Sequence, residues 1–152
     1  MSSAYLDGLK MLGRRERSEK QIRQRLARKE YAQDEIDEAI ARLRQERAIN
    51  DQRVAEAIAR TETAIRKRGK VRVRMQLERA GIAKETAKAA IEEVFDTIDD
   101  EALLESSLRK RLRGRETIAD DREFARLFRY LIGQGFESDK ILSLLRSRQH
   151  RR

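Results

Sequence analysis

One spacing of apolar residues occurs three times in this sequence, and it constrains the fold more than any other feature. The spacing consists of steps of four, five, five and four residues, and the second and third copies begin 51 and then 54 residues further along. A period of this length is typical of tandem structural repeats, which stack to bury a continuous core. The three copies are Ile22, Leu26, Tyr31, Ile36 and Ile40; Val73, Leu77, Ile82, Ala87 and Ile91; and Leu127, Leu131, Phe136, Ile141 and Leu145.

The steps within one copy predict two helices joined by a tight turn. A step of four residues keeps two side chains on one face of a helix, whereas the two successive steps of five residues span the turn. The central residue, Tyr31 in the first copy, is then expected to fill the corner between the helices. Glycine precedes this corner at Gly81 and Gly135, where a helix end often requires a left-handed residue. Because Glu30 replaces the glycine in the first copy, we expect that corner to close differently.

Each predicted helix pair follows a further apolar helix, so the repeating unit has three helices. We therefore predict an all-α fold, an elongated and curved array of three tandem three-helix repeats. The repeats are placed at residues 1–49, 50–98 and 99–152, the last with a basic C-terminal tail, and Gly114–Asp120 is expected to form an added loop. The apolar residues that mark the additional helices are Leu6, Leu9 and Leu12; Val54, Ile58 and Ile65; and Leu104, Leu108 and Leu112.

Local sequence signals agree with a helical chain. There is no proline, a residue that breaks helix interiors because it lacks an amide hydrogen and clashes with the preceding turn. Ser18, with Gln21 three residues later, matches the capping-box pattern of a helix start. Asn50 is expected to cap the first helix of the second repeat. Asp34 and Ser138 are expected to cap the third helices of the first and third repeats.

The residues on which most enzymes depend are scarce. The chain contains no cysteine, and its single histidine, His150, lies in the basic tail without a second metal ligand nearby. No glycine-rich phosphate loop is present, and no serine is paired with a general base. We therefore expect a protein that is not an enzyme and that uses no cofactor, metal ion or small-molecule substrate.

Apolar runs are too short for a membrane segment. None approaches the roughly 18 residues that a membrane span requires, and the N-terminal residues lack the apolar core of a signal peptide. We therefore expect a cytoplasmic protein without membrane association.

The charge of the chain favours a polyanionic partner. The formal net charge is +9, a balance typical of proteins that bind nucleic acid. Phosphate contacts would supply affinity without sequence specificity; the alternative is that many arginines pair with nearby carboxylates. The basic surface expected to face DNA or a protein partner comprises Arg25, Arg28, Lys67, Arg68, Lys70, Arg72, Arg74 and Arg79, and a secondary basic patch comprises Arg109, Lys110, Arg111, Arg113 and Arg115.

Five short segments occur in an order and spacing that cover nearly the whole chain. They are Arg17–Glu19 leading to Ile22 and Leu26, Asn50–Ala55, Lys67–Val73 with Leu77, Gly81–Ile82, and Phe128–Leu145 with its Gly135-Phe136 pair. In this combination the sequence resembles the RecX family, bacterial regulators of the RecA recombinase. The chain departs from the family pattern at Asn50-Asp51, where paired aspartates are common, at Val54, where an aromatic residue is usual, and at Glu30, where glycine is expected. These departures concern capping and packing.

The resemblance implies a function and a set of partners. RecX-like proteins bind RecA and its filament on single-stranded DNA, lie in the helical groove of the filament, and restrain its ATPase, strand-exchange and co-protease activities. A curved basic array suits such a groove, because it can contact several subunits and DNA phosphates together. The implied partners are RecA, the RecA–DNA filament and nucleic acid.

Two other functions fit the sequence less well. A helix-turn-helix transcription regulator needs base-reading residues near the start of its recognition helix, but the third helices begin acidic, with Asp34 and Glu35, or mixed, with Lys84 and Glu85. A protein-binding scaffold without DNA contacts is distinguished by salt, because phosphate binding weakens steeply as salt rises.

Overall fold

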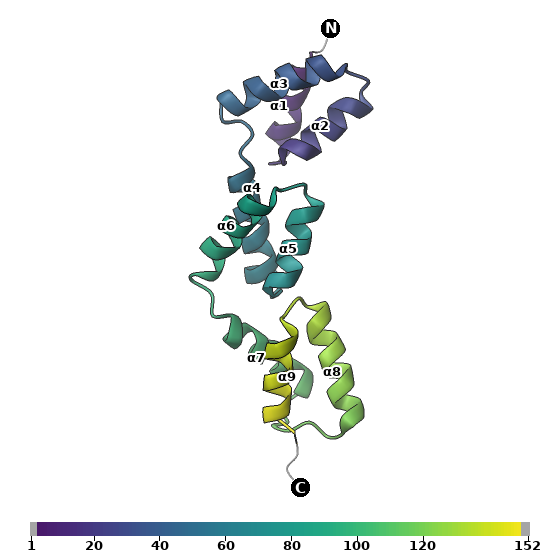
Figure 1. Ribbon diagram of the computed structural model, residues 1–152, viewed down its shortest axis with the longest axis vertical. Helices are drawn as coiled ribbons and strands as arrows, with labels where there is room; N and C mark the ends of the chain where they lie inside the picture. Colours follow the sequence, from purple (N-terminus) through teal and green to yellow (C-terminus); the bar gives the residue numbers. More distant parts are fainter. Residues whose placement is uncertain (1–2, 150–152) are drawn as a thin grey trace.

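Nine α-helices and one short π-helical segment form an elongated array in the computed structural model, which describes residues 3–149 (Figure 1). The tail residue His150 lies outside the described residues. The helices of the first repeat are α1 (Ala4–Arg14), α2 (Glu19–Arg28) and α3 (Gln33–Gln45). Those of the second are α4 (Asp51–Arg60), continued by η1 (Thr61–Ile65), then α5 (Lys70–Arg79) and α6 (Lys84–Phe95). The third contains α7 (Asp100–Leu112), α8 (Asp121–Gly133) and α9 (Ser138–Ser147).

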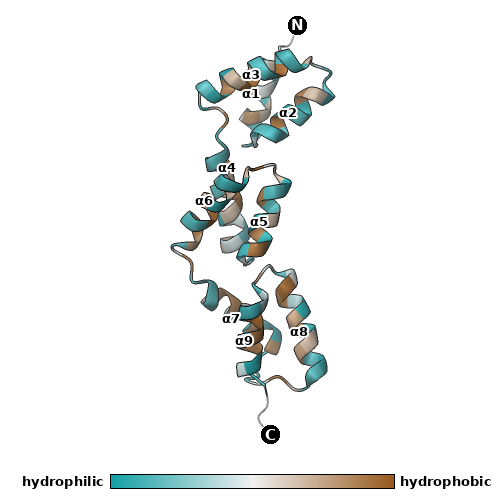
Figure 2. Ribbon diagram, viewed as in Figure 1, coloured by the Kyte–Doolittle hydropathy of each residue, from teal (hydrophilic) through white to brown (hydrophobic). Residues whose placement is uncertain are grey.

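Each repeat buries its own apolar core, and the predicted all-α array of three-helix repeats is confirmed. The buried apolar residues fall into three separate clusters, one in each repeat. Along each helix, apolar and polar residues alternate with the helical period, so that apolar residues gather between the helices (Figure 2). Every residue of the threefold spacing is buried except Tyr31, which is partly buried at its corner. The linkers around residues 50 and 99 separate the repeats, and their division into separate domains stays a prediction.

The corner between the second and third helices has the same conformation in all three repeats. Glu30 has a φ of 67°, close to the 78° of Gly81 and the 95° of Gly135. In each repeat the amide of the next residue donates to a carbonyl five residues earlier, as Tyr31 does to Leu26 at 3.4 Å. The expectation that the Glu30 corner closes differently was therefore wrong. A glutamate in this left-handed conformation carries a steric cost that glycine avoids.

Helix capping follows the sequence at some helices only. The Ser18–Gln21 capping box forms at α2, and the Asn50 side chain accepts from the amide of Arg53 at 3.1 Å at α4. Asp34 and Ser138 do not cap α3 and α9, because both lie inside their helices, which begin at Gln33 and Ser138 itself. Asp34 and the other acidic residues of the first turns lie near the positive end of the helix dipole, which favours them without a cap.

Ile65 departs from its expected place in the core. Seven residues after Ile58, it would share the buried face of a continuous α-helix. The helix instead widens into the π-helical segment η1, whose extra residue per turn rotates the chain. Ile65 is therefore 74% exposed, while Glu62 and Thr63 are buried.

The three middle helices are stacked end to end along one long edge of the molecule, in the order α2, α5, α8 (Figure 1). The Ser18 hydroxyl, at the start of α2, donates to the carbonyl of Ala80, at the end of α5, over 2.5 Å. One repeat further on, the amides of Gly69 and Val71 donate to the carbonyls of Gln134 and Gly135, both over 2.9 Å. At this second junction the unpaired amides at the start of α5 thus meet unpaired carbonyls at the end of α8, whereas at the first junction a serine hydroxyl makes the contact.

This stacking explains which corners have glycine. A Cβ atom on Gly135 would collide with Arg72 of the neighbouring repeat, and one on Gly81 would collide with Lys20. Glu30 occupies the outer end of the array, where no further repeat of the described chain is stacked against it. The start of α8 differs from the starts of α2 and α5, because the loop between α7 and α8, and not another repeat, lies beside it. Within the predicted loop Gly114–Asp120, Ile118 is buried and its amide donates to the carbonyl of Arg148 at 2.8 Å.

Candidate nucleic-acid interface

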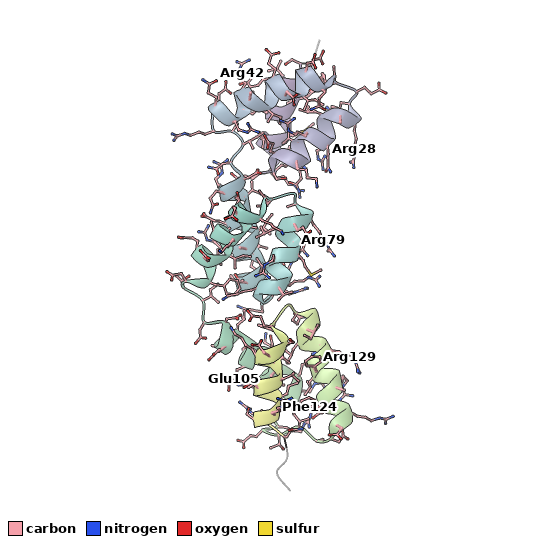
Figure 3. All side chains as sticks on the ribbon, viewed as in Figure 1. Arg28, Arg42, Arg79, Glu105, Phe124 and Arg129 are labelled. Atoms are coloured by element: carbon pink, nitrogen blue, oxygen red, sulfur yellow. The ribbon has the colours of Figure 1, made fainter. Side chains whose placement is uncertain are left out.

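Arginines on the middle helices of the first two repeats lie along one long edge of the array. Arg28 on α2 and Arg79 on α5 occupy equivalent positions, and each lies two helical turns after a residue at the start of its helix, Gln21 and Arg72. Figure 3 labels both arginines, and their side chains lie along the same long edge of the array. We define the arginine face as a named set of arginines, of which Arg28 and Arg79 lie on this edge and Arg15 and Arg66 line a groove with Arg79. The set comprises Arg14, Arg15, Arg17, Arg25 and Arg28 in the first repeat, Arg66, Arg72 and Arg79 in the second, and Arg111, Arg115 and Arg126 in the third.

The arginine face includes a groove at the junction of the first two repeats. Arg15 and Gln21 line it from the first repeat, and Arg66, Arg79 and Glu62 line it from the second. Glu62 is buried and pairs with Arg66 at 3.2 Å. Arg15 and Arg79 form no salt bridge with any described residue, so the groove carries positive charge that is free to attract an anion.

Not all of the predicted basic residues belong to this side of the molecule. Lys70 and Arg74 line a second groove, between α5 and α6, with Lys84 and Lys88. Four carboxylates line the same groove, so its charges balance. These carboxylates are Glu78, Glu85, Glu92 and Glu137. The eight predicted residues therefore do not form one stripe; Arg72 and Arg79 share a side, as expected, and Arg74 faces the other groove.

None of the eight predicted cations forms a salt bridge within residues 3–149. Arg72 is nevertheless partly engaged, because it is half-buried at the junction of the second and third repeats and its Nη1 donates to the carbonyl of Gly133 at 3.3 Å. Lys67 takes a left-handed conformation before α5, and Arg68 beside it is half-buried. The Nζ of Lys70 lies 5.3 Å from the centroid of the Phe95 ring, a contact that leaves its charge unpaired.

The secondary basic patch is divided among separate contacts. Arg115 binds Glu123 through two hydrogen bonds, of 2.8 and 2.6 Å, and Arg109 pairs with Glu105 at 3.7 Å. Arg111 stacks over the ring of Tyr130 at 3.7 Å from its centroid. Lys110 and Arg113 are exposed and form no salt bridge with a described residue. Arg115 in particular serves the fold of the third repeat, because its carboxylate partner Glu123 is buried.

Among the named arginines of the arginine face, those of the third repeat have partners and those of the first do not, although the exposed Arg129 of α8, on the same edge in Figure 3, also forms no salt bridge with a described residue. In the third, Arg115 and Arg126 pair with Glu123, and Arg111 stacks on Tyr130. In the second, one arginine pairs with Glu62 and another donates to a backbone carbonyl. The five arginines of the first repeat form no salt bridge with any described residue. The predicted basic surface included Arg25 and Arg28 but not Arg14, Arg15 and Arg17. The sequence shows this run of arginines, but it does not show which of them pair with a carboxylate.

Two kinds of site are not found in residues 3–149. No group of three histidine, cysteine or acidic side chains there is arranged to hold a metal ion. No helix of that part is long and apolar enough to cross a membrane.

Repeated three-helix units with separate cores and one arginine-rich side define a modular all-helical binding protein. Two family models match the chain: "RecX, first three-helix domain" over residues 4–43 and "RecX, second three-helix domain" over residues 50–91. Together they cover more than half of the chain, which belongs to the RecX family.

Known proteins and structures support this assignment. Over 138 residues the chain is 31% identical to the regulatory protein RecX of Syntrophotalea carbinolica, covering 90% of each chain. It is 29% identical to the regulatory protein RecX of Trichlorobacter lovleyi over 147 residues, covering 94% of each. The crystal structure of RecX from Lactobacillus salivarius has the same fold, with a TM-score of 0.76 at 21% identity, over 95% of this chain and 93% of that one.

Proposed function

We propose that this protein binds the RecA recombinase and its filament on single-stranded DNA and inhibits the filament's ATPase, recombinase and co-protease activities. Membership of the RecX family supports the partner, since relatives with this repeat architecture are named as regulatory proteins. The structural observation that supports the proposal is the arginine face, whose five first-repeat members form no salt bridge with a carboxylate of residues 3–149. Uncompensated arginines on one long edge suit an extended polyanion or an acidic protein surface.

The elongated array supports binding to a filament rather than to a single small site. Arg28 of the first repeat and Arg79 of the second lie at successive positions along one edge of the array (Figure 3). Several weak contacts made together raise the total affinity even when each one is modest. In this proposal the protein acts in the cytoplasm without catalysing a reaction, and its DNA contacts are to phosphates and independent of sequence.

The alternative of a helix-turn-helix transcription regulator finds less support. Its recognition helix needs exposed base-reading residues in its first turn. The first turn of α3 instead exposes Asp34 and Glu35, which would meet DNA phosphates with like charge.

The test is a titration of the protein into RecA filaments assembled on single-stranded DNA with ATP. We expect ATP hydrolysis to fall progressively and to recover as salt is raised, because contacts between arginines and phosphates or carboxylates weaken with salt. ATP hydrolysis that stays at its full rate when the protein is in excess over RecA would contradict the proposal.

A further inference from the structure

The first repeat contains a buried arginine, Arg17, that has no hydrogen-bond or salt-bridge partner among residues 3–149. Arg17, in the turn between α1 and α2, is only 8% exposed. Its Nε atom is buried without a hydrogen-bond partner among the described residues. A buried cation without compensation is costly, and native proteins satisfy nearly all such groups, so Arg17 requires an explanation.

The surroundings of Arg17 add further positive charge. Burial lowers the pKa of the Arg17 guanidinium, and the nearby charges of Arg25, Arg15 and Arg14 lower it further. None of these four arginines pairs with a carboxylate of a described residue. The acids on either side of Arg17 are engaged elsewhere, because Glu16 pairs with Arg53 and Glu19 with Arg44.

The second repeat has arginines at two of the four equivalent positions, and a glutamate neutralises one of them. Arg66 and Arg68 lie 51 residues after Arg15 and Arg17, at the equivalent positions. There, Glu62 pairs with Arg66 at 3.2 Å. The first repeat has Met11 at the position equivalent to Glu62, so its cluster retains the arginines and lacks the acid.

We infer that Arg14, Arg15, Arg17 and Arg25 form a binding site for a phosphodiester group of a nucleic-acid strand. Guanidinium groups bind phosphate oxygens through paired hydrogen bonds, and a phosphate supplies the anion that Glu62 supplies in the second repeat. A nucleic-acid strand is favoured over a single acidic side chain because a strand presents several phosphates in series, which can meet several of the four guanidiniums. Arg15 also lines the groove that contains Arg79, which lets a strand continue from this site along the arginine face.

This inference rests on the part of the proposed function that concerns binding to DNA. It can be tested without RecA. The probe is a fluorescein-labelled single-stranded oligonucleotide of 30 thymidines, whose binding is followed by fluorescence anisotropy at several salt concentrations. For Arg17→Met we expect binding about tenfold weaker, as expected for one lost charged contact. The slope of log affinity against log salt should fall by about one, because the variant makes about one phosphate contact fewer. The control Lys88→Met removes one exposed charge from α6, on another side of the array, and should bind as the unmodified protein does.

Thermal stability separates a binding role from a structural one. Methionine fills much of the space of arginine without its charge, so Arg17→Met should melt at the same temperature as the unmodified protein or higher. The oligonucleotide should raise the melting temperature of the unmodified protein more than that of the variant. A variant that binds as tightly as the unmodified protein would overturn the inference, as would one that melts lower and loses binding only in proportion to its unfolded fraction.

Exposed members of the cluster provide a second, independent test. Arg15→Gln and Arg25→Gln change exposed side chains and should leave the fold intact, so they remain informative if Arg17→Met does not fold. Each should weaken oligonucleotide binding several-fold. If these variants bind the oligonucleotide normally and instead lose affinity for the RecA filament, the cluster contacts an acidic protein surface, and the phosphate assignment is wrong. If the unmodified protein binds the oligonucleotide through this cluster but does not inhibit RecA, the site stands and the proposed function fails.

Discussion

Several single residues in this molecule stabilise a helix end and a contact between segments at once. The Ser18 hydroxyl accepts from the amide of Gln21 at 3.2 Å within α2 and donates to the carbonyl of Ala80 in the next repeat. Glu123, inside α8, receives the Arg115 guanidinium and the Ala119 amide from the loop that closes the third repeat. Both side chains are buried, so their removal leaves donors or acceptors that water does not easily satisfy.

Replacement of Ser18 tests the junction between the first two repeats. Ser18→Ala removes a cap and leaves the Ala80 carbonyl buried without its donor, so we expect the free energy of unfolding to fall by about 2 kcal/mol. Ser3→Ala is a matched control, because Ser3 caps α1 through the amide of Leu6 and is exposed. That control should lose about 1 kcal/mol or less. Urea unfolding followed by circular dichroism measures both, and equal losses would show that the Ala80 contact contributes nothing.

The hydrogen bonds of Glu123 predict that the stability of the fold depends on pH. Its hydrogen bonds with Arg115, and then with the Ala119 amide, lower the pKa of the Glu123 carboxyl to about 2. Because this pKa lies below that of the unfolded chain, about 4.3, the carboxylate stabilises the fold above that pH. The stabilisation is lost as the pH falls toward 2. Urea unfolding between pH 6 and pH 2, conditions chosen to span about this window, should therefore show a steeper loss of stability for the unmodified protein than for Glu123→Gln; parallel profiles would contradict the assignment.

At the scale of helices and turns, the apolar spacing was sufficient to predict three helices per repeat and the buried residues of the second and third helices, but among the residues that mark the first helices Leu6 and Ile65 are exposed. A helix face and a turn are local features, and they follow from the order of residues along the chain. The π-helical segment was not predicted, because the apolar residues Val54, Ile58 and Ile65 have the spacing of a continuous α-helix. The end-to-end stacking of α2, α5 and α8 was also out of reach, since it depends on how the repeats are oriented. In the sequence, only the glycines at two of the three corners indicate this stacking.

The three corners give a prediction at this scale. Glu30 holds a left-handed conformation with no neighbouring repeat, so Glu30→Gly should relieve steric cost and raise the free energy of unfolding by about 1 kcal/mol. Gly135→Ala places a methyl group against Arg72 in a left-handed conformation, and it should lower the free energy of unfolding by more than about 1 kcal/mol. Chemical denaturation compares the two, and a stabilising Gly135→Ala would contradict the close contact between the repeats.

At the scale of the whole molecule, the arrangement of charge matters more than its amount. Of the basic residues expected from the sequence, Lys70 and Arg74 lie in the balanced groove beside α6, whereas Arg25, Arg28, Arg72 and Arg79 belong to the arginine face, whose charge compensation differs between the repeats. Sequence reasoning identified Arg28 and Arg79 but also Arg115, because the chain order does not reveal that Glu123 lies within 2.6 Å of it. The acids that neutralise arginines in the second and third repeats are absent from the equivalent place in the first. The first two repeats are therefore where the arginine face is most available to a partner.

The central claim is that this face, rather than net charge, binds the RecA filament. The most direct measurement is inhibition of ATP hydrolysis by RecA filaments with Arg28→Glu/Arg79→Glu, compared with the control Arg47→Glu/Lys88→Glu. All four residues are exposed and form no salt bridge with a described residue, and the two variants change the net charge equally. Arg72 is left in place because it contacts the third repeat.

We predict that the first variant requires at least about tenfold more protein for half-inhibition. The control should inhibit as the unmodified protein does, and both variants should keep the same helical content. Equal inhibition by the two variants would contradict the account.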